Sequence, residues 1–559
     1  MRTLALSAAL RIQERRLWGT LGRQAEDPAT TQAATLAEIL ATNRDTRYGL
    51  QHRFGRIESP RQFAEAVPVN DYEALRPLIE SQADTRAAEL TREDPLLYSR
   101  TSGTTGVPKL VPLTPEGLAR QSRAQRIFAT AIHRGSGIFA GRLLGIGSPA
   151  VEERLPNRRK VGSASGVIYE SMPRLVRSKY VLPPAVLGVS DDDSRYWLIA
   201  VLGMAHGDLT GLGTANPSTL LRLRDTMCQH WDDLVRSVAT GRLPEGLDAS
   251  AALRASVRAR LGRRPQRARD LRALGDPAGR TIARVWPRLA AVTTWTHGSC
   301  AVALQRLREH LDARTAVIEL GYSASELRGT VCHDVASGQC VPLLGDVYYE
   351  FVERDAWEAG ERATVGLADL DLGGQYYVVI TTVDGLYRYD MNDILEVTGR
   401  LGATPCLAFV QKGRGVTNIT GEKLHESQVI DAVLHAGGGR APGAGFFVML
   451  ADTPAAAYRL VVEGPLDDAE TEGLAERVDV RLTETNVEYR AKRRSGRLGQ
   501  VQLQEVATGS GRRYRAYLVA TGQRETQLKV QHLQRAEDVA FDFVAGAADG
   551  DTGDVEAAP

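Results

Sequence analysis

The sequence predicts an α/β fold in two domains: a large N-terminal domain of mixed β-sheets packed by helices and a smaller α+β C-terminal domain. Short β-branched runs alternate with helical stretches from about residue 96, a pattern typical of sheets buried between helices. The chain of 559 residues is too long for one hydrophobic core. A glycine-rich segment near residue 415 separates two runs of such elements, which predicts a domain boundary there.

The expected elements follow in chain order. Residues 1–95 have the apolar spacing of packed helices, beginning with an amphipathic helix at the N-terminus. In the first domain we expect strands at 291–295, 315–320 and 376–380 and a helix at 299–311. In the second domain we expect strands at 446–450 and 458–462 and a helix at about 468–486. The arginine-rich run 254–272 is expected to be the solvated face of an amphipathic helix, with Leu253, Val257 and Leu261 on its apolar side.

The domain limits are predicted from composition. We place them at 1–415, 416–543 and 544–559, the last being an acidic tail of small residues that we expect to be disordered. The segment Gly413-Arg414-Gly415 is a predicted flexible point.

Charge and cysteine content exclude several classes of protein. The net charge of +1 argues against a nucleic-acid-binding protein. The five cysteines lack zinc-ligand spacing, and no run approaches the roughly 20 apolar residues of a membrane helix. Charged residues interrupt the N-terminal apolar run, unlike a signal peptide. We therefore expect a soluble cytoplasmic protein, a monomer or weak dimer, with no structural metal.

Residues Tyr98 to Lys109, YSRTSGTTGVPK, form the first chemical motif. Its glycines let the backbone approach a ligand closely, and its hydroxyls and lysine suit a polyphosphate. The spacing does not fit the nucleotide P-loop, and a plain Ser/Thr/Gly surface turn is the alternative. Lys109 is one of only seven lysines in a chain that otherwise uses arginine. A biased genome explains that scarcity, although it leaves open whether the remaining lysines are functional.

Two further motifs follow. Glu319 to Gly329, ELGYSASELRG, offers a tyrosine face for a base and Glu326 as one carboxylate for a phosphate-bound Mg²⁺. An ordinary carboxylate at a helix start is the alternative for Glu326. In Asp384 to Gly399, DGLYRYDMNDILEVTG, Asp393 is expected at the mouth of a strand, where it can accept hydrogen bonds from a ribose diol. Asp390 competes for that role.

The order TSGTTGVPK, GYSASE, LYRYDMND resembles the adenylate-forming enzymes, and within them the GH3 acyl acid amido synthetases. Flanking segments such as VPVNDYEALRPLIE, WPRLAAVTTWTHGSC and GGQYYVVITTVDGLYRY resemble the same family. The resemblance covers about residues 20–535 and implies an adenylate-forming N-terminal domain with a C-terminal lid domain. Val107-Pro108 and Met391-Asn392 depart from the family pattern, and the second departure could alter the turn that aims Asp393.

The resemblance also implies roles for individual residues. The predicted ATP- and AMP-binding residues are Thr101, Ser102, Gly103, Thr104, Thr105, Gly106, Lys109, Gly298, Ser299, Tyr322, Ser323, Ala324, Ser325, Asp393 and Arg414. Among these, Thr101 to Gly106 would hold the phosphates, Gly298, Ser299 and Tyr322 to Ser325 the adenine, and Asp393 the ribose. Glu326 would bind Mg²⁺, and Lys423 and Lys529 would be the catalytic lysines.

The implied reaction joins a carboxylic acid to an amine in two steps. ATP first converts the acid to an acyl adenylate with release of pyrophosphate, and the amine of an amino acid or a related amine then displaces AMP. The expected cofactors are ATP and Mg²⁺, and the expected partners are small molecules. A coenzyme A or carrier-protein ligase and a non-catalytic nucleotide-binding homologue are the alternatives.

The acyl pocket is expected between helix 118–132 and segment 163–176. Tyr169, Met172 and Leu175 would line it, although core packing explains these three residues equally well. Arg123, Arg126 and Arg174 are open candidates for steering a carboxylate.

Overall fold

The computed structural model describes residues 2–101, 109–276, 279–413, 415–420, 422–466, 472–521, 523 and 528–543. The chain divides into two compact units, Met1–Lys412 (unit 1) and Gly413–Pro559 (unit 2). Several predicted features lie outside the described residues: the phosphate-loop residues 102–108, Arg414 and the tail 544–559.

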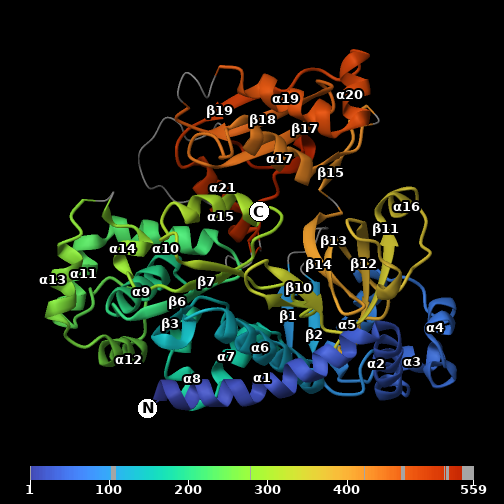
Figure 1. Ribbon diagram of the computed structural model, residues 1–559, viewed down its shortest axis with the longest axis horizontal. Coiled ribbons are helices and arrows are strands. Elements are labelled where there is room, and N and C mark those ends of the chain that lie inside the picture. The colour runs from blue at the N-terminus through green and yellow to red at the C-terminus, as the bar shows by residue number, and fades with distance from the viewer. Residues whose placement is uncertain are drawn as a thin grey trace. The chain divides into compact units, whose positions relative to one another are not determined.

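Unit 1 begins with helices, as the apolar spacing predicts. These are α1 (Arg2–Glu26), α2 (Pro28–Asn43), α3 (Arg47–Gln51), α4 (Pro60–Ala66) and α5 (Tyr72–Thr85), with a short 3₁₀ turn η1 (Phe54–Arg56). Side chains of Asp27, Thr46, Ser59 and Asp71 cap the N-termini of α2 to α5, which satisfies backbone N–H groups that have no partner within the helix. Helix α1 packs along α6 (Pro115–Gly135), the long helix that follows the phosphate motif (Figure 1).

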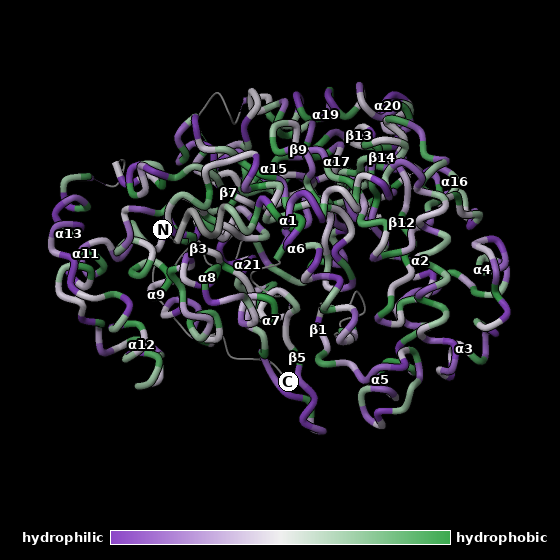
Figure 2. Tube along the Cα trace, turned by 60° about the horizontal axis from the view of Figure 1, so that its bottom comes forward, coloured by the Kyte–Doolittle hydropathy of each residue, from purple (hydrophilic) through white to green (hydrophobic). Residues whose placement is uncertain are grey.

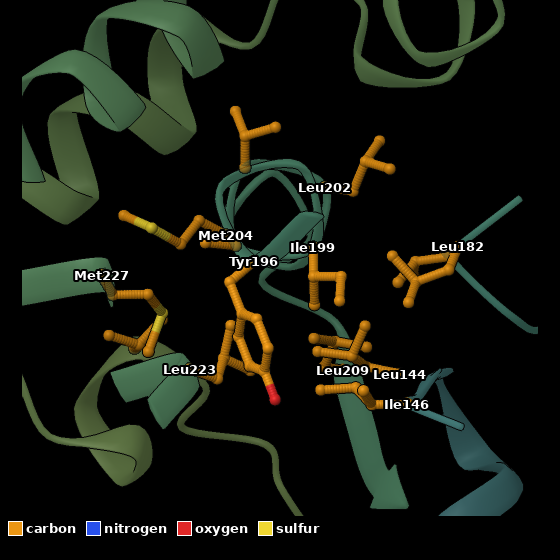
Figure 3. Close-up of a cluster of buried hydrophobic side chains, with 14 of the residues drawn as sticks. Leu144, Ile146, Leu182, Tyr196, Ile199, Leu202, Met204, Leu209, Leu223 and Met227 are labelled. Atoms are coloured by element: carbon orange, nitrogen blue, oxygen red, sulfur yellow. The ribbon is translucent and has the colours of Figure 1, made fainter. Parts of the chain in front are cut away.

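The central sheet of unit 1 is parallel, with strand order β3-β6-β7-β8. Its strands are β3 (Arg142–Gly145), β6 (Leu209–Gly213), β7 (Ala291–Thr294) and β8 (Ala316–Glu319). Helix α9 (Asp192–Met204) is buried along most of its length and packs on this sheet. In Figure 3, Ile199 of α9 and Leu209 of β6 lie in one apolar cluster. The predicted strands at 291–295 and 315–320 are therefore present, shortened by a residue or two.

Helices cover the sheet and extend away from it. They are α10 (Ser218–Gln229), α11 (Trp231–Thr240), α12 (Ala251–Leu261), α13 (Pro265–Arg272), α14 (Ile282–Val285) and α15 (Cys300–Arg308). The prediction of one helix in the arginine-rich run is wrong, because Gly262 ends α12 with a positive φ of 56° and Pro265 begins α13. Val257 and Leu261 are buried as expected, whereas α13 is mostly hydrophilic along its length (Figure 2).

A second sheet in unit 1 carries the phosphate motif. It has the order β2-β1-β5-β4 and contains both parallel and antiparallel pairs. Its strands are β1 (Leu97–Thr101), β2 (Lys109–Leu113), β4 (Glu153–Arg154) and β5 (Lys160–Val161). Further helical segments are η2 (Ile138–Ala140), α7 (Ala164–Ser171), α8 (Arg174–Arg177) and η3 (Pro184–Gly188).

The third sheet of unit 1 is antiparallel, with the order β11-β12-β13-β14. Its strands are β11 (Tyr348–Glu353), β12 (Gln375–Thr381), β13 (Tyr389–Leu401) and β14 (Thr404–Lys412). The hairpin of β9 (Thr330–Asp334) and β10 (Gln339–Pro342), together with α16 (Arg354–Glu358) and η5 (Leu367–Asp369), completes unit 1. The predicted strand at 376–380 is β12.

Unit 2 is an α+β unit with a mixed sheet of order β19-β18-β17-β20. Its strands are β15 (Val416–Thr417), β16 (Leu424–His425), β17 (Phe447–Asp452), β18 (Ala457–Glu463), β19 (Gln502–Val506) and β20 (Leu533–Arg535). Its helices are α17 (Glu426–Ala436), α19 (Leu474–Thr485), α20 (Val487–Arg494), α21 (Ser510–Ala520) and η7 (Ala536–Asp538). The predicted strands at 446–450 and 458–462 are β17 and β18, and the predicted helix at 468–486 corresponds to α19.

Among the described helices, none combines the length and the apolar character that a membrane crossing requires.

Candidate active site

The phosphate motif joins two paired strands of unit 1. Thr101 ends β1 and faces Lys109, the first residue of β2, across the antiparallel pair. The predicted phosphate-binding residues Ser102, Gly103, Thr104, Thr105 and Gly106 form the connection and lie outside the described residues. The Lys109 ammonium lies over the Tyr72 ring, 5.1 Å from its centroid. This contact positions the positive charge at the end of the motif.

A buried carboxylate ties the helix after this motif to the ribose motif. Thr114 caps α6 by accepting a hydrogen bond from the Gly117 N–H at 3.0 Å. Asp384 Oδ1 in turn accepts both the N–H and the hydroxyl of Thr114, each at 2.7 Å. Burial raises the pKa of the Asp384 carboxyl to about 6. A side chain at position 117 would collide with that carboxylate, so the glycine permits the contact.

The first predicted adenine segment lies at the start of α15. Gly298 has φ of +60°, and a Cβ atom there would meet the Phe409 ring at 2.7 Å. Ser299 is the N-cap residue of the helix. Glycine is therefore required at 298 both for the left-handed backbone and for the close approach of β14.

The second adenine segment is a tight hairpin. The Gly329 N–H donates to the Tyr322 carbonyl, and the Ala324 N–H donates to the Leu327 carbonyl, both at 2.9 Å. Ser323, Ala324 and Ser325 are half-buried, and the Tyr322 ring lies parallel to Phe409 with 6.4 Å between centroids. Phe409 is thus an aromatic neighbour of both adenine segments that the sequence did not indicate.

Glu319 holds the two adenine segments together. Its buried carboxylate accepts hydrogen bonds from the Thr296 N–H at 2.7 Å and the Gly321 N–H at 2.8 Å, and its Oε2 lies 3.2 Å from His297 Nδ1. The hydrogen bond with Glu319 raises the pKa of the His297 imidazole. Glu319 begins the motif ELGYSASE, yet nothing in the sequence assigned it this bridging role.

The predicted Mg²⁺ residue, Glu326, lies in the turn of the hairpin and not at the start of a helix, so the structure does not support the alternative interpretation. Burial raises the pKa of its carboxyl, against the opposing charges of Lys412 and Lys109. Among the described residues, no group of three or more His, Cys, Asp or Glu side chains is arranged to hold a metal.

Asp393 lies inside β13, four residues after the strand begins at Tyr389. The expected position at the mouth of the strand is wrong, because β13 already pairs with β12 from Tyr389 and Asp390 onward. Asn392, a residue type common in turns, has φ of +50° within the strand. The pairing accommodates this distortion through a bulge in β13, where Met391, Asn392 and Asp393 lie opposite the single residue Val378 of β12.

Asp393 is 3% exposed, and both of its carboxylate oxygens have partners. The Tyr322 hydroxyl donates to Oδ2 at 2.7 Å, and the Lys412 ammonium lies 2.8 Å from Oδ1. The competing carboxylate, Asp390, accepts the N–H of Asn392 at 2.7 Å. Asp393 therefore already accepts a hydrogen bond from a hydroxyl group, whereas Asp390 accepts one from a backbone N–H two residues further along the same strand.

Lys412 is a site residue that the sequence reasoning missed. It ends β14, directly opposite Asp393 in the strand register. Its side chain is 58% exposed, and the nearby carboxylates of Asp393, Glu326 and Asp390 outweigh partial desolvation and raise the pKa of its ammonium. The scarcity of lysine in this chain was the one available signal for it, but Lys412 belongs to none of the motifs described above.

In unit 2, backbone hydrogen bonds position the predicted catalytic Lys423. Its N–H donates to Glu488 Oε2 at 3.1 Å, and its carbonyl accepts from Asn486 Nδ2 at 2.8 Å. The preceding Glu422 is fully buried and accepts the N–H groups of Ile419 and Thr420. Although burial would raise the pKa of Glu422, its hydrogen bonds hold it below its ordinary value.

The segment of the second predicted lysine, Lys529, lies beside that of Lys423 within unit 2. Glu426, the first residue of α17, accepts the His532 N–H at 2.5 Å. Burial raises the pKa of the Glu426 carboxyl to about 7, and the Lys529 charge acts against that rise. Glu426 thus connects the two lysine segments, which are about 100 residues apart in sequence.

The residues proposed for the acyl pocket divide between core and surface. Tyr169 is buried, donates its hydroxyl to the Leu182 carbonyl at 2.7 Å and belongs to the core of the parallel sheet. Met172 packs against the same core, and Leu175 packs against a second one. These contacts favour the core-packing alternative. Arg123 forms an ion pair with Asp346, and the side chains of Arg126 and Arg174 are exposed.

The sequence matches three domains of one family. Residues 19–315 match the GH3 family N-terminal domain, residues 340–412 the central domain and residues 427–538 the C-terminal domain. The chain belongs to the GH3 family. The resemblance predicted from the sequence is therefore confirmed.

Relatives of this GH3 chain include plant enzymes. Indole-3-acetic acid-amido synthetase GH3.15 of Arabidopsis thaliana is 27% identical over 432 residues, which cover 72% of this chain and 71% of the relative. Probable indole-3-acetic acid-amido synthetase GH3.2 of Oryza sativa subsp. japonica is 26% identical over 554 residues, which cover 89% and 87%.

Solved structures confirm the predicted fold of this GH3 chain. GH3.15 acyl acid amido synthetase superposes with a TM-score of 0.81 at 22% identity, covering 93% of this chain and 94% of the other. A 2-hydroxyisobutyryl-CoA ligase in the postadenylation state superposes with a TM-score of 0.53 at 12% identity, covering 91% and 89%. The architecture of mixed sheets packed by helices, followed by a C-terminal domain, is that of the adenylate-forming ligases.

Proposed function

We propose that this GH3 chain is an ATP-dependent acid-amido synthetase, a ligase that forms a C–N bond. It adenylates a small carboxylic acid, releases pyrophosphate and transfers the acyl group to the amine of an amino acid or related amine. The observation that carries the proposal is the Tyr322–Asp393–Lys412 arrangement, in a chain that matches all three GH3 domains. The names of the plant relatives support the amide product.

The nucleotide is assigned to unit 1. Asp393 would accept the ribose hydroxyls, because each carboxylate oxygen can accept one further hydrogen bond beside its present partner. Gly298, Ser299 and the segment Tyr322 to Ser325 would surround the adenine. Thr101 to Gly106, together with Lys109, would hold the phosphates, and Arg414 at the start of unit 2 would be a further nucleotide-binding residue. The Glu319 bridge supports this assignment because it fastens the two adenine segments to each other.

A magnesium ion fits Glu326. The carboxylate is desolvated and lies in the same network of charges as Asp393 and Lys109. Mg²⁺ commonly takes only one or two protein carboxylates when phosphate oxygens supply other ligands, so a single glutamate suffices. When bound, the ion would neutralise charge on the phosphates.

Activation of the acid is the first chemical step. A carboxylate oxygen of the acid attacks the α-phosphorus of ATP, the bond to the β-phosphate oxygen breaks, and pyrophosphate leaves. In this step the protein mainly positions the reactants and stabilises charge. We assign Lys423 and Lys529 to the adenylate phosphate, where a lysine is a compact positive charge.

Transfer to the amine is the second step. The amine nitrogen attacks the acyl carbon, loses a proton, and AMP leaves with the electron pair of the broken C–O bond. No catalytic serine or cysteine is needed, because the adenylate already supplies a good leaving group. The segment 413–415 is the proposed hinge for movement of the C-terminal domain between the steps, a motion of the kind that commonly limits such enzymes.

Acid-dependent exchange of labelled pyrophosphate into ATP tests the first step. We expect exchange and AMP release with at least one member of a panel of aryl, indolyl and fatty acids that includes indole-3-acetic acid. Release of ADP, or no exchange with any acid, would contradict the proposal. Mass spectrometry with amino acids and with coenzyme A as competing acceptors should show an amide, whereas a thioester product would identify an acyl-CoA ligase.

A further inference from the structure

One half-buried arginine near the proposed Mg²⁺ residue has no ion-pair partner among the described residues. Arg328 lies in the Tyr322–Gly329 hairpin, two residues after Glu326. Leu327, between them, is 2% exposed and packs in the core with Tyr322. Glu326 and Arg328, on either side of Leu327, are half-buried.

Arg328 has an unusual partner for a half-buried guanidinium. Its Nη2 donates to Gln125 Oε1 of α6 at 2.6 Å. Among the described residues no carboxylate forms an ion pair with it. A cation that is partly removed from water is stabilised by an anionic partner. The neutral amide of Gln125 supplies one hydrogen bond and no charge.

The guanidinium also has donors to spare. Its Nε and Nη1 have no hydrogen-bond partner within the described part of the chain. Arg328 is half-buried, so part of the residue borders accessible space. An arginine presents these N–H groups as a planar fork that matches a carboxylate.

One cavity brings this fork beside the proposed Mg²⁺ residue. Arg328, Glu326 and Gln121 line one small cavity of about 20 Å³, which is large enough for water but not for an acyl substrate. Gln121 and Gln125 are four residues apart on α6 and therefore share one face of the helix. That face opposes the hairpin that carries Glu326.

We propose that Arg328 binds a substrate carboxylate next to Glu326, either that of the acid before adenylation or the α-carboxylate of the acceptor amino acid. This inference rests on the proposed function and names a specificity-determining residue for it. The other candidates are less suited: Arg123 already pairs with Asp346, and Arg126 is solvent-exposed. The alternative role for Arg328 is a structural link between the hairpin and α6.

Direct binding tests the inference without turnover. In calorimetric titrations with α,β-methylene-ATP present, indole-3-acetate, benzoate and octanoate are each compared with the alcohol that replaces the carboxylate by CH₂OH. The preferred amino acid is likewise compared with its decarboxylated amine. We expect one of these two comparisons to show a carboxylate preference of about 10- to 100-fold, the range for hydrogen bonds to charged groups, that disappears in Arg328→Gln. No preference in the wild type, or an undiminished one in Arg328→Gln, would overturn the inference.

Kinetics separate the two carboxylates and the structural role. If Arg328 holds the acid, Arg328→Gln raises the KM for the acid in pyrophosphate exchange. If it holds the amino acid, the variant raises the KM of transfer from preformed adenylate and leaves exchange unchanged. Arg328→Lys should recover part of the affinity that Arg328→Gln loses. Arg126→Gln, the matched control, should keep the wild-type KM. A Gln125→Ala variant that reproduces the full effect would assign Arg328 to the structural link alone. Absence of exchange in the wild type, in contrast, would count against the proposed function itself.

Discussion

The two units hold their lysines in different ways. In unit 1, Lys412 forms a side-chain ion pair with Asp393, and Tyr322 occupies the other oxygen of that carboxylate. In unit 2, backbone hydrogen bonds to Glu488 and Asn486 fix the position of Lys423. The described contacts of Lys412 therefore involve the charge of its own side chain, whereas those of Lys423 involve its backbone and the side chains of a neighbouring helix start. Substitutions should distinguish these two cases.

The largest effect is expected in unit 1. Asp393→Ala removes the proposed ribose acceptor and leaves the Tyr322 hydroxyl without its partner. We expect kcat/KM for ATP in pyrophosphate exchange to fall by about 100- to 1,000-fold, the range typical of losing one preorganised polar contact. Asp390→Asn is the matched control and should cost less than about tenfold. Equal losses in the two variants would remove the distinction drawn between these carboxylates.

A loss of about 100-fold is expected for Lys529→Ala in unit 2, because a positive charge near the adenylate phosphate is removed. Pyrophosphate exchange measures it. Lys492→Ala changes a lysine of the same unit in α20 and should retain nearly normal exchange. Lys423→Arg keeps charge but not the compact ammonium, and we expect it to remain impaired. Full activity of that variant would leave genome composition as the sole explanation for the rare lysines.

Each unit also contains a buried carboxyl with a raised pKa, Glu426 in unit 2 and Asp384 in unit 1. A raised pKa means that the folded state holds the proton more tightly, so the stability it contributes is present at low pH and is lost as pH rises. The loss falls between about pH 4 and 7 for Glu426, whose pKa is about 7.

Glu426→Gln stays neutral and still accepts the His532 N–H. Relative to the wild type, its free energy of unfolding should be higher by about 1 to 3 kcal/mol at pH 8 and nearly equal at pH 4. Urea unfolding at both pH values gives this difference. Burial lowers the pKa of the His532 imidazole to about 4, and comparing the variant with the wild type cancels the opposing contribution of that group. An identical pH profile in the two proteins would show that Glu426 is not the titrating group.

The same comparison in unit 1 uses Asp384→Asn, which keeps an oxygen for the Thr114 donors. The pKa of about 6 for Asp384 limits the change to the interval from about pH 4 to 6. We expect a smaller gain than for Glu426→Gln, about 1 kcal/mol at pH 8, because the amide N–H₂ group must be accommodated beside Gly117. A loss of stability at pH 8 would mean that the ionised carboxylate is required to hold α6.

The smallest effect is expected at Gly298. Gly298→Ala places a Cβ atom 2.7 Å from the Phe409 ring in a left-handed backbone, which should lower the free energy of unfolding by about 1 to 2 kcal/mol and raise the KM for ATP. Gly373→Ala is the control, because φ there is +79° with no atom within 4 Å of the added carbon. If both variants lose the same stability, the left-handed backbone alone explains the need for glycine at position 298, and the close contact with Phe409 does not contribute.

Local patterns in the sequence predicted much of the fold. The runs that became β7, β8, β12, β17 and β18 were recognisable because β-branched residues and apolar alternation belong to neighbouring positions. The break between α12 and α13 was also visible in Gly262 and Pro265, but the continuous arginine pattern led to a single helix. The position of Asp393 differs from the expectation because Asn392, a residue type common in turns, lies within a strand here. Pairing with β12 continues on both sides of it.

The sequence by itself determined the family, the order of the elements and the motifs assigned to nucleotide and phosphate, since all of these are recorded in short contiguous runs. Only the tertiary structure identified Lys412 as the partner of Asp393, Glu319 as the bridge between the adenine segments, and Arg328 as a half-buried cation bonded to Gln125. The physical reason is that ion pairing and desolvation depend on strand register and packing between distant segments. A residue type alone does not specify those quantities.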